Sequence, residues 1–490
     1  MLSSHHQSLH IIQQNPILSI NIVIFLQNQS IEFGGFKKLL YLCDIILKWH
    51  KMIAEFTVKN FYSIRSEQKL SFVPSKDTLM EDEYCHQIND NVKLLKIGII
   101  YGANASGKSN VLQALDYFRR LMIHCPNDKS EPLPHEPFLM DDHSTKDHSL
   151  MCMSFYQNGI KHSLNVEFDN VRIYCESLMI YNSKQPTLLY SRIYNAETDS
   201  TSIKFGNELK MPKADQRTIE GNTINNCSVM AAFGKSNVEA TKLNDVYLYF
   251  KISMSSVLTP FKSISGYTRD KLKNDKSGIL KNFVLQFLQA SDFNISDFSI
   301  HEQEYILTPD VSRAIGNMPM PKDVHGSILK EGKYKSEEIF FRHKTDEGVF
   351  DMDEQLESAG TMRFMGMAVI LFELLSKSNF VMIDEVETSI HYELLSYFIK
   401  CFLANSENES QLVLTTHDIN LLNENFIRRD TIWFTDKDSC GESHIVRLSN
   451  LGLHRNLSPY NAYKQGKLVN LPFLESPYIN FDFSIADEEK

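Results

Sequence analysis

One eight-residue segment limits what this chain can fold into more than any other. Residues 102–109 match the pattern GxxxxGK[ST], whose glycines allow a loop to wrap tightly around phosphate. The apolar run Leu94–Tyr101 precedes the segment, and apolar residues at helical spacing follow it from Asn110 to Ile123. Strand, glycine-rich loop and helix in this order form an anion site, because the loop N–H groups and the helix N-terminus attract negative charge. The sequence therefore predicts an α/β fold built around a phosphate-binding loop.

The residues of this loop have distinct expected roles. Lys108 is expected to reach the β- and γ-phosphates of ATP, and Ser109 is expected to bind Mg²⁺ through its hydroxyl group. The remaining positions are expected to contact the phosphates; they are Gly102, Ala103, Asn104, Ala105, Ser106, Gly107 and Asn110. The loop thus predicts ATP and Mg²⁺ as cofactors.

A second segment, Phe380–Glu385, is an apolar run that ends in two acids. A solvated strand end gives the same pattern, but the phosphate-binding loop favours a catalytic interpretation. Asp384 is expected to hold the Mg²⁺ shell. Glu385 is expected to polarise the attacking water as a general base.

Two weaker segments complete the set. Glu357–Thr361 places a Ser-x-Gly turn before a Met-rich helix, where Ser358 and Gly360 either bind a γ-phosphate or act as an ordinary helix cap. His417 ends the apolar run that follows the paired acids. It is expected to hydrogen-bond the γ-phosphate, although a single histidine is more often structural.

In this order, the four motifs resemble the ABC-type ATPases of the RecF, SMC and OLD group, and most closely the AAA15 family. The stretches that carry the resemblance are Phe56–Ile64, Tyr101–Asn110, Asp384–His391, Leu412–Asp418 and Arg428–Phe434. The resemblance spans nearly all of Met52 to about Pro472. It departs from the classical signature at Ala359 and Thr361, and no Q-loop glutamine can be placed.

The resemblance implies an ABC-type head with an antiparallel β-subdomain and a helical insertion. Ser358–Thr361 would be the signature motif, and Thr388–His391 would lie in the D-loop. Two heads would sandwich ATP between the phosphate-binding loop of one and the signature of the other, giving a homodimer or higher oligomer. No long coiled coil is expected, because the sequence has no sustained heptad run.

The same resemblance implies a role in prokaryotic anti-phage defence by abortive infection. The chain would be a sensor subunit that controls a separate effector, a nuclease, and a phage-encoded protein or DNA would be the trigger. The alternative is a repair or recombination ATPase that binds duplex DNA or DNA ends, with basic stretches at Lys210–Lys213, Lys262–Lys276 and Lys330–Lys335. A third possibility is a nucleotide-locked scaffold that scarcely hydrolyses ATP.

The expected organisation follows from these assignments. Residues 1–51 form a non-native or poorly ordered extension, or else an arm that docks on a partner, because clean alternation begins only at Met52. Residues 52–206 form the N-terminal ATPase lobe, and 207–350 form a helical or mixed insertion. Residues 351–475 form the C-terminal lobe, and 476–490 form a tail.

Composition narrows the choice of partners. The formal net charge is −11, whereas a surface that grips nucleic acid throughout is usually basic, so any DNA contact should be local. The eight cysteines are scattered singly, which fits a reducing cytosol. The longest early apolar run, Ile17–Leu26, is too short to cross a bilayer, so no transmembrane span is expected and a cytoplasmic location is expected. His135, His143 and His148 with Asp141 and Asp142 are interpreted as a flexible polar loop rather than a metal site. Asp436–Asp438 is interpreted as a charged turn rather than a nuclease acid cluster.

Overall fold

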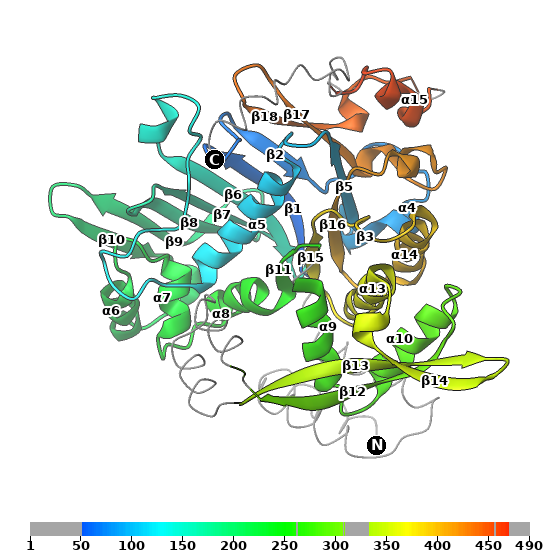
Figure 1. Cartoon of the computed structure of the whole chain (residues 1–490). Helices are drawn as coiled ribbons and strands as arrows, with labels where there is room; N and C mark the ends of the chain where they lie inside the picture. Colours follow the sequence, from blue (N-terminus) through cyan, green and yellow to red (C-terminus); the bar gives the residue numbers. More distant parts are fainter. Residues whose placement is uncertain (1–50, 261–262, 307, 309–332, 455–456, 470–490) are drawn as a thin grey trace, which may run out of the picture.

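A six-stranded sheet joins the segments that carry the sequence motifs. The computed structural model describes residues 51–260, 263–306, 308, 333–454 and 457–469 (Figure 1). The sheet has the order β11-β15-β16-β5-β17-β18, and every pair in it is parallel except β17 with β18. Its strands are β5 (Ile97–Gly102), β11 (Met254–Leu258), β15 (Phe380–Ile383), β16 (Gln411–Thr416), β17 (Ile432–Lys437) and β18 (Ser443–Arg447).

Three strands of this sheet are buried along their whole length. Every residue of β5, β15 and β16 is buried, which explains why each appears in the sequence as a continuous apolar run. β16 lies between β5 and β15. The carboxyl ends of all three strands therefore lie at one edge of the sheet.

A seven-stranded antiparallel sheet forms the β-subdomain, with the order β10-β9-β8-β7-β6-β1-β2. Burial alternates strictly along β6, as expected of a sheet that covers a core with one face only. Asn158 and Gly159, both at positive φ, make the tight turn between β6 and β7, as the sequence predicts. The strands are β1 (Lys51–Lys59), β2 (Gln68–Ser71), β6 (Ser149–Gln157), β7 (Ile160–Phe168), β8 (Ile173–Tyr181), β9 (Thr187–Asn195) and β10 (Ser200–Phe205).

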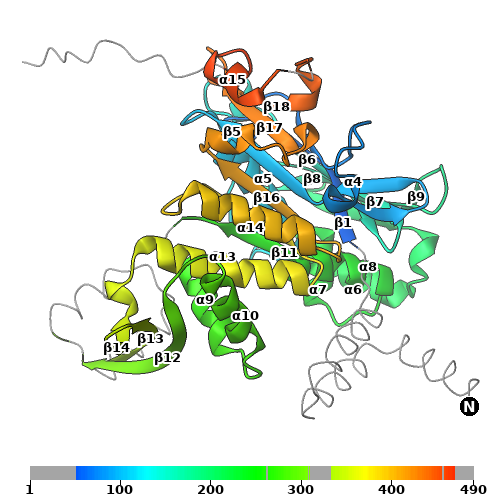
Figure 2. The ribbon, with the colours of Figure 1, turned by 90° about the vertical axis from the view of Figure 1, so that its right-hand side faces the viewer.

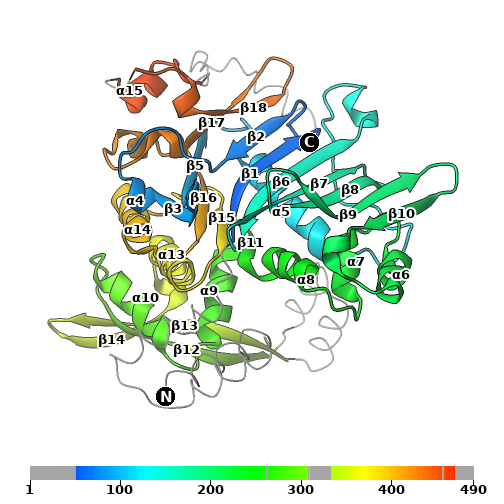
Figure 3. The ribbon, with the colours of Figure 1, turned by 180° about the vertical axis from the view of Figure 1, so that it is seen from behind.

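Helix α5 (Lys108–Ile123) packs between the two sheets. Its Phe118 ring lies 5.8 Å from that of Phe56 in β1, and its Tyr117 ring lies 5.4 Å from that of Phe168 in β7. Helices α13 (Ala359–Ser376) and α14 (Tyr392–Asn405) lie on the opposite side of the six-stranded sheet (Figures 2 and 3). α13 is apolar and long enough to span a membrane, but 67% of it is buried inside the protein, as in the core helix of a globular domain.

The middle of the chain adds helices and a separate three-stranded sheet. The sheet, with the order β12-β13-β14, lies beyond α9 and α10 at one end of the molecule (Figure 1). Its strands are β12 (Ile295–Ile306), β13 (Lys333–Thr345) and β14 (Gly348–Asp353).

The remaining α-helices and strands of the described chain are α4 (Glu81–Tyr84), β3 (Cys85–Asn89), β4 (Val92–Leu95), α6 (Lys213–Asn222), α7 (Val229–Lys235), α8 (Thr241–Leu248), α9 (Ser263–Lys273), α10 (Ile279–Gln289) and α15 (Pro459–Lys464).

The expected α/β fold class is confirmed: the chain has a mostly parallel sheet that carries the motifs, an antiparallel β-subdomain and an insertion of helices with a third sheet. Within the described ranges no helix exceeds the 18 residues of α13, so this part of the chain holds no long coiled coil. The expectations for residues 1–50 and for the tail 476–490 fall outside the described residues, whereas Lys51 already belongs to β1.

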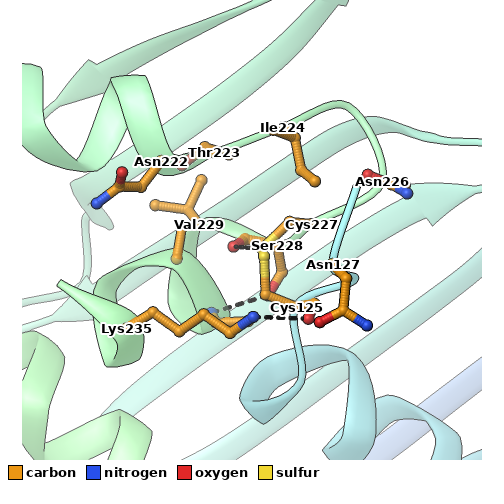
Figure 4. The surroundings of a disulfide bond; sticks show 12 residues. Cys125, Asn127, Asn222, Thr223, Ile224, Asn226, Cys227, Ser228, Val229 and Lys235 are labelled. Carbon is orange, nitrogen blue, oxygen red and sulfur yellow. Dashed lines mark hydrogen bonds between the residues drawn. A yellow bond between two sulfur atoms is a disulfide. The ribbon is translucent and has the colours of Figure 1, made fainter. Parts of the chain in front are cut away.

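The expectation that all the cysteines are single is wrong for one pair. Cys125 and Cys227, separated by 102 residues, form a disulfide that joins the end of α5 to the start of α7 (Figure 4). Nearby, the Ser228 hydroxyl donates to the Leu121 carbonyl at 2.6 Å, and Lys235 Nζ donates to the Cys125 carbonyl at 2.8 Å. The two cysteines meet because α7 packs against the end of α5, which their spacing in the sequence does not reveal.

Candidate nucleotide site

The sequence motifs meet where three neighbouring strands end. The phosphate-binding loop leaves β5 at Gly102, Asp384 follows β15 directly, and His417 follows β16 directly. In open α/β sheets, ligands bind at this carboxyl edge. The fold thus brings together three segments that are far apart in the sequence.

The loop can be built only with glycine at two positions. Gly107 has φ of 104°, and a Cβ added there would lie 2.3 Å from Ser443 Oγ. A Cβ on Gly102 would lie 2.3 Å from Thr435 Oγ1. The hydroxyls of Ser106 and Thr435 are 2.6 Å apart. The loop therefore packs against Thr435 of β17 and Ser443 at the start of β18.

The N-terminus of α5 is suited to an anion. Gly107 is its N-cap and offers no side-chain acceptor, and the first turn contains no acidic residue. The N–H groups of that turn therefore remain available as donors, in the positive field of the helix dipole. Asn104 and Ala105 are exposed, so the loop is open to solvent. This donor set fits the phosphates of a nucleotide.

Lys108 has the environment expected of a phosphate ligand. Its side chain is buried, and its Nζ donates to the carbonyl oxygens of Gly102 and Ala103, both at 3.0 Å. These acceptors are neutral and leave the ammonium charge uncompensated by direct contact. Burial lowers the pKa of Lys108, whereas the nearby carboxylates of Asp384, Glu387 and Glu385 raise it.

One threonine hydroxyl fixes both paired acids. Thr415 Oγ1 donates to Asp384 Oδ1 and accepts a hydrogen bond from the Glu385 N–H at 2.8 Å. Asp384 is buried, and Glu385, with φ of 46°, adopts the left-handed backbone conformation. Asp384 and Ser109 are the residues whose oxygens could hold Mg²⁺ in this structure. The sequence marked Thr415 only as part of a motif, not as a site residue.

Glu387 holds the backbone of His417. The backbone N–H of His417 donates to Glu387 Oε1 at 2.6 Å, and its Nδ1 lies 3.4 Å from Lys108 Nζ. Burial and the Lys108 charge lower the pKa of His417, which favours the neutral imidazole. Sequence reasoning missed Glu387; its place two residues after the paired acids was the available signal.

Ser358 and Gly360 lie at the N-terminus of α13, next to the segment that follows the paired acids. Ser358 caps α13, its Oγ accepting from the Thr361 N–H at 3.0 Å. A Cβ on Gly360 would lie 2.7 Å from the Ser389 carbonyl oxygen, so this turn packs closely against the segment predicted to be the D-loop. Three residues on, the buried Arg363 donates from Nη2 to the Glu385 carbonyl at 3.2 Å. The N-terminal part of α13 is thus connected to the paired acids of the same chain.

Among the described residues, the other polar clusters do not form a second site of this kind. His135 pairs with Ser149 at 2.7 Å, and His148 pairs with Glu167 at 2.7 Å, so these histidines have separate partners. The expectation that His135 lies in an exposed polar loop is wrong, because its side chain is buried. Among the described residues, the ligand atoms of Asp438, Glu442 and His444 lie within 4.8 Å of one another. Asp438, however, is exposed and accepts two backbone N–H bonds of its own turn.

Comparison with known families decides the assignment. Residues 98–225 and 255–423, more than half of the chain, match the family described as "AAA domain, putative AbiEii toxin, Type IV TA system". The chain belongs to this AAA family. The matched segments of the AAA domain include the phosphate-binding loop, the Ser358–Gly360 turn, the paired acids and His417. Membership supports an AAA-type ATPase domain, and the finer assignments to the ABC type and to AAA15 stay predictions.

Two solved structures are similar to the AAA domain. One is the SMC head domain from Thermotoga maritima, with 14% identity and a TM-score of 0.36, covering 81% of this chain and 98% of the other. The second is an SmcHead bound to the C-winged helix domain of ScpA, with 13% identity and a TM-score of 0.37, covering 84% and 99%. No curated protein matches the sequence.

Proposed function

We propose that this AAA protein binds Mg·ATP at the carboxyl edge of β5, β16 and β15 and hydrolyses it to ADP and phosphate. The observation that carries the proposal is the meeting of Lys108, His417 and the paired acids at adjacent strand ends. Lys108 and the N–H groups at the start of α5 would bind the β- and γ-phosphates. Ser109 and Asp384 would hold Mg²⁺, which supplies positive charge to the phosphates when bound.

Glu385 would act as the general base. Its N–H is held by Thr415 and its carbonyl by Arg363, so the backbone that carries the carboxylate is fixed on both sides. A positioned general base typically contributes about 10²- to 10⁴-fold in rate. His417, neutral and beside Lys108, would contact the phosphate group that Lys108 holds and would register its loss.

A second copy of the chain would complete the site. Within one chain, the Ser358 hydroxyl hydrogen-bonds to Thr361, and Gly360 packs against Ser389 in the segment predicted to be the D-loop. These contacts fix the shape of the Ser358–Gly360 turn. In a head-to-tail homodimer or higher oligomer, Ser358 and Gly360 would meet the ATP bound to the partner's loop. ATP would then control association of the heads.

The biological role we propose is that of a cytoplasmic sensor subunit in an anti-phage defence module of the AAA15 type. The ATPase would control a separate effector, a nuclease acting in trans, and would respond to a phage-encoded protein or to DNA. Support comes from the family description, which names a toxin of a type IV toxin–antitoxin system.

The second candidate, a repair ATPase that binds DNA, has less support from the surface. Two lysines of the basic stretch that includes α9 already have acidic partners. Lys271 pairs with Glu373 at 2.8 Å, and Lys273 pairs with Glu337. Lys333, within the basic stretch Lys330–Lys335, pairs with Glu304 at 2.6 Å. Lysines already paired with carboxylates have less charge to offer to phosphates.

Co-purification tests the role. The Glu385→Gln variant should bind ATP without turning it over and so trap the assembled state. Tagged and expressed from its native locus, it is expected to elute with a stoichiometric nuclease-like or toxin-like protein. Elution with duplex DNA and without a protein partner would contradict the defence role and support the repair role.

A further inference from the structure

Two buried polar atoms of opposite charge lie close to the catalytic turn without hydrogen-bond partners. One is Nε of Arg363 on α13, and the other is Oε2 of Glu387 in the turn after β15. Burying an unpaired atom of a charged group is unfavourable, because the group loses water without gaining a partner. These two are complementary, since one is a donor and the other an acceptor.

The remaining atoms of both side chains are already committed. Arg363 donates from Nη1 to the Pro260 carbonyl at 2.7 Å and from Nη2 to the Glu385 carbonyl at 3.2 Å. Glu387 accepts the His417 N–H at its other oxygen. Each side chain thus holds the backbone of one residue proposed to act in hydrolysis. These backbone contacts use Arg363 Nη2 and Glu387 Oε1, so Arg363 Nε and Glu387 Oε2 remain available to each other.

The two charges already act on each other. Burial lowers the pKa of Arg363 to about 10, and the carboxylates of Glu387 and Glu385 oppose that fall. Burial is the main cause of the lowered pKa values of His417 and Lys108, and the carboxylates of Glu387, Glu385 and Asp384 oppose that fall. The Glu387 carboxylate thus acts electrostatically on Arg363, His417 and Lys108. Of these three cations or potential cations, only Arg363 comes from α13.

We propose that Arg363 and Glu387 are a positioning pair that closes when nucleotide is bound. Closure joins Arg363 Nε–H to Glu387 Oε2, and this draws the signature end of α13 onto the turn that holds Glu385 and His417. The inference deepens the proposed ATPase function and depends on it. Through this pair, occupation of the Ser358–Gly360 surface by a partner's ATP would be transmitted to the hydrolytic residues of the same chain.

A double-mutant cycle on the full-length protein tests the pair. Arg363→Gln, Glu387→Gln and the double variant are compared with wild type for ATP affinity and for kcat at saturating Mg·ATP. Each single change is expected to lower kcat at least about tenfold, because the pair can no longer close and position the turn. Binding of ATP should stay within about threefold, and the double variant should be no slower than the worse single one. Additive losses, or unchanged kcat in Glu387→Gln, would overturn the proposal.

Two controls separate this pair from a general structural role. Glu407→Gln removes the same charge from an exposed position before β16 and should leave kcat unchanged. Arg363→Lys retains the charge and should recover part of the rate lost in Arg363→Gln. Thermal unfolding of each variant establishes that it is folded.

Hydrogen exchange on the Glu385→Gln protein supplies a second measurement that needs no change to the pair. ATP is expected to protect the segments 358–366 and 384–391 together, and Glu387→Gln in the same background should abolish protection of 358–366. Protection of that segment independent of Glu387 would contradict the pair. If wild type neither binds nor hydrolyses ATP, the proposed function fails; if it does both and the cycle is additive, only the pair fails.

Discussion

The side-chain nitrogen of Lys108 lies 3.4 Å from Nδ1 of His417, although 309 residues separate them in the sequence. β5 and β16 are neighbouring parallel strands, so the residues that follow them meet at the same edge. This contact joins the phosphate-binding loop to the last of the four motifs.

Thr415 should matter for both stability and activity. In Thr415→Val the Glu385 N–H loses its acceptor and Asp384 loses a donor, in a place where Thr415 is fully buried. An unsatisfied buried group costs about 1–3 kcal/mol, and urea denaturation should show a loss of that size. ATP hydrolysis should fall at least tenfold. Thr415→Ser, which keeps the hydroxyl, should lose much less; equal losses in both variants would contradict the role of the hydroxyl.

Gly107 should be irreplaceable in the loop. Gly107→Ala places a methyl group against Ser443 Oγ at positive φ and should abolish ATP binding measured by calorimetry. Gly452 also has positive φ, 65°, but no atom lies within 4 Å of an added Cβ. Gly452→Ala therefore controls for backbone strain alone and should bind ATP normally. If both variants bind ATP equally well, the proposed close contact between the loop and β18 is contradicted.

The protein should lose stability in mild acid. Burial lowers the pKa of His135 and of His162 to about 4, from 6.5 when unfolded. Well above pH 6.5 each histidine is neutral in both the folded and the unfolded chain. As the pH falls through 6.5 towards 4, the unfolded chain gains protons that the folded chain does not, so stability falls. At pH 5 each residue should cost about 2 kcal/mol relative to pH 7.

Urea denaturation at the two pH values measures this loss. His162→Gln should reduce the difference by about the share of one histidine. His301→Gln, at an exposed position, should leave the difference unchanged. An identical pH dependence in wild type and His162→Gln would show that this histidine is not buried in the neutral form.

The Cys125–Cys227 disulfide should contribute stability without taking part in hydrolysis. It closes a segment of about 100 residues, and such a cross-link typically contributes about 2–4 kcal/mol. Reductant or Cys227→Ser should lower the melting temperature, whereas kcat should stay within about twofold. Cys440→Ser, at an exposed free cysteine, is the control. No change on reduction would show that the bond does not form in the protein.

Local sequence patterns were sufficient for the strands and helix around the loop. β5, β15 and β16 are short apolar runs with all residues buried, and α5 has one periodic apolar face, so each could be located without knowledge of its neighbours. The turn at Asn158 and Gly159 was predictable for the same reason, because its chemistry is local.

Features that depend on non-local packing could not be predicted. β11 joins the sheet beside β15, yet its Ser255 and Ser256 give it no apolar run. Thr415, Glu387 and Arg363 are ordinary polar residues in the sequence, and their importance comes from backbone groups that the fold brings to them. The same holds for Cys125 and Cys227, which meet only because α7 packs on α5.

The measurement that tests the central claim most directly is ATP turnover by purified wild type beside Lys108→Ala and Glu385→Gln. Wild type should bind and hydrolyse Mg·ATP, and Lys108→Ala should lose both properties. Glu385→Gln should still bind ATP but hydrolyse it about 100-fold or more slowly. Lys204→Ala, at an exposed position in β10, should behave as wild type. Absence of turnover in wild type, or turnover unaffected by both site changes, would contradict the account.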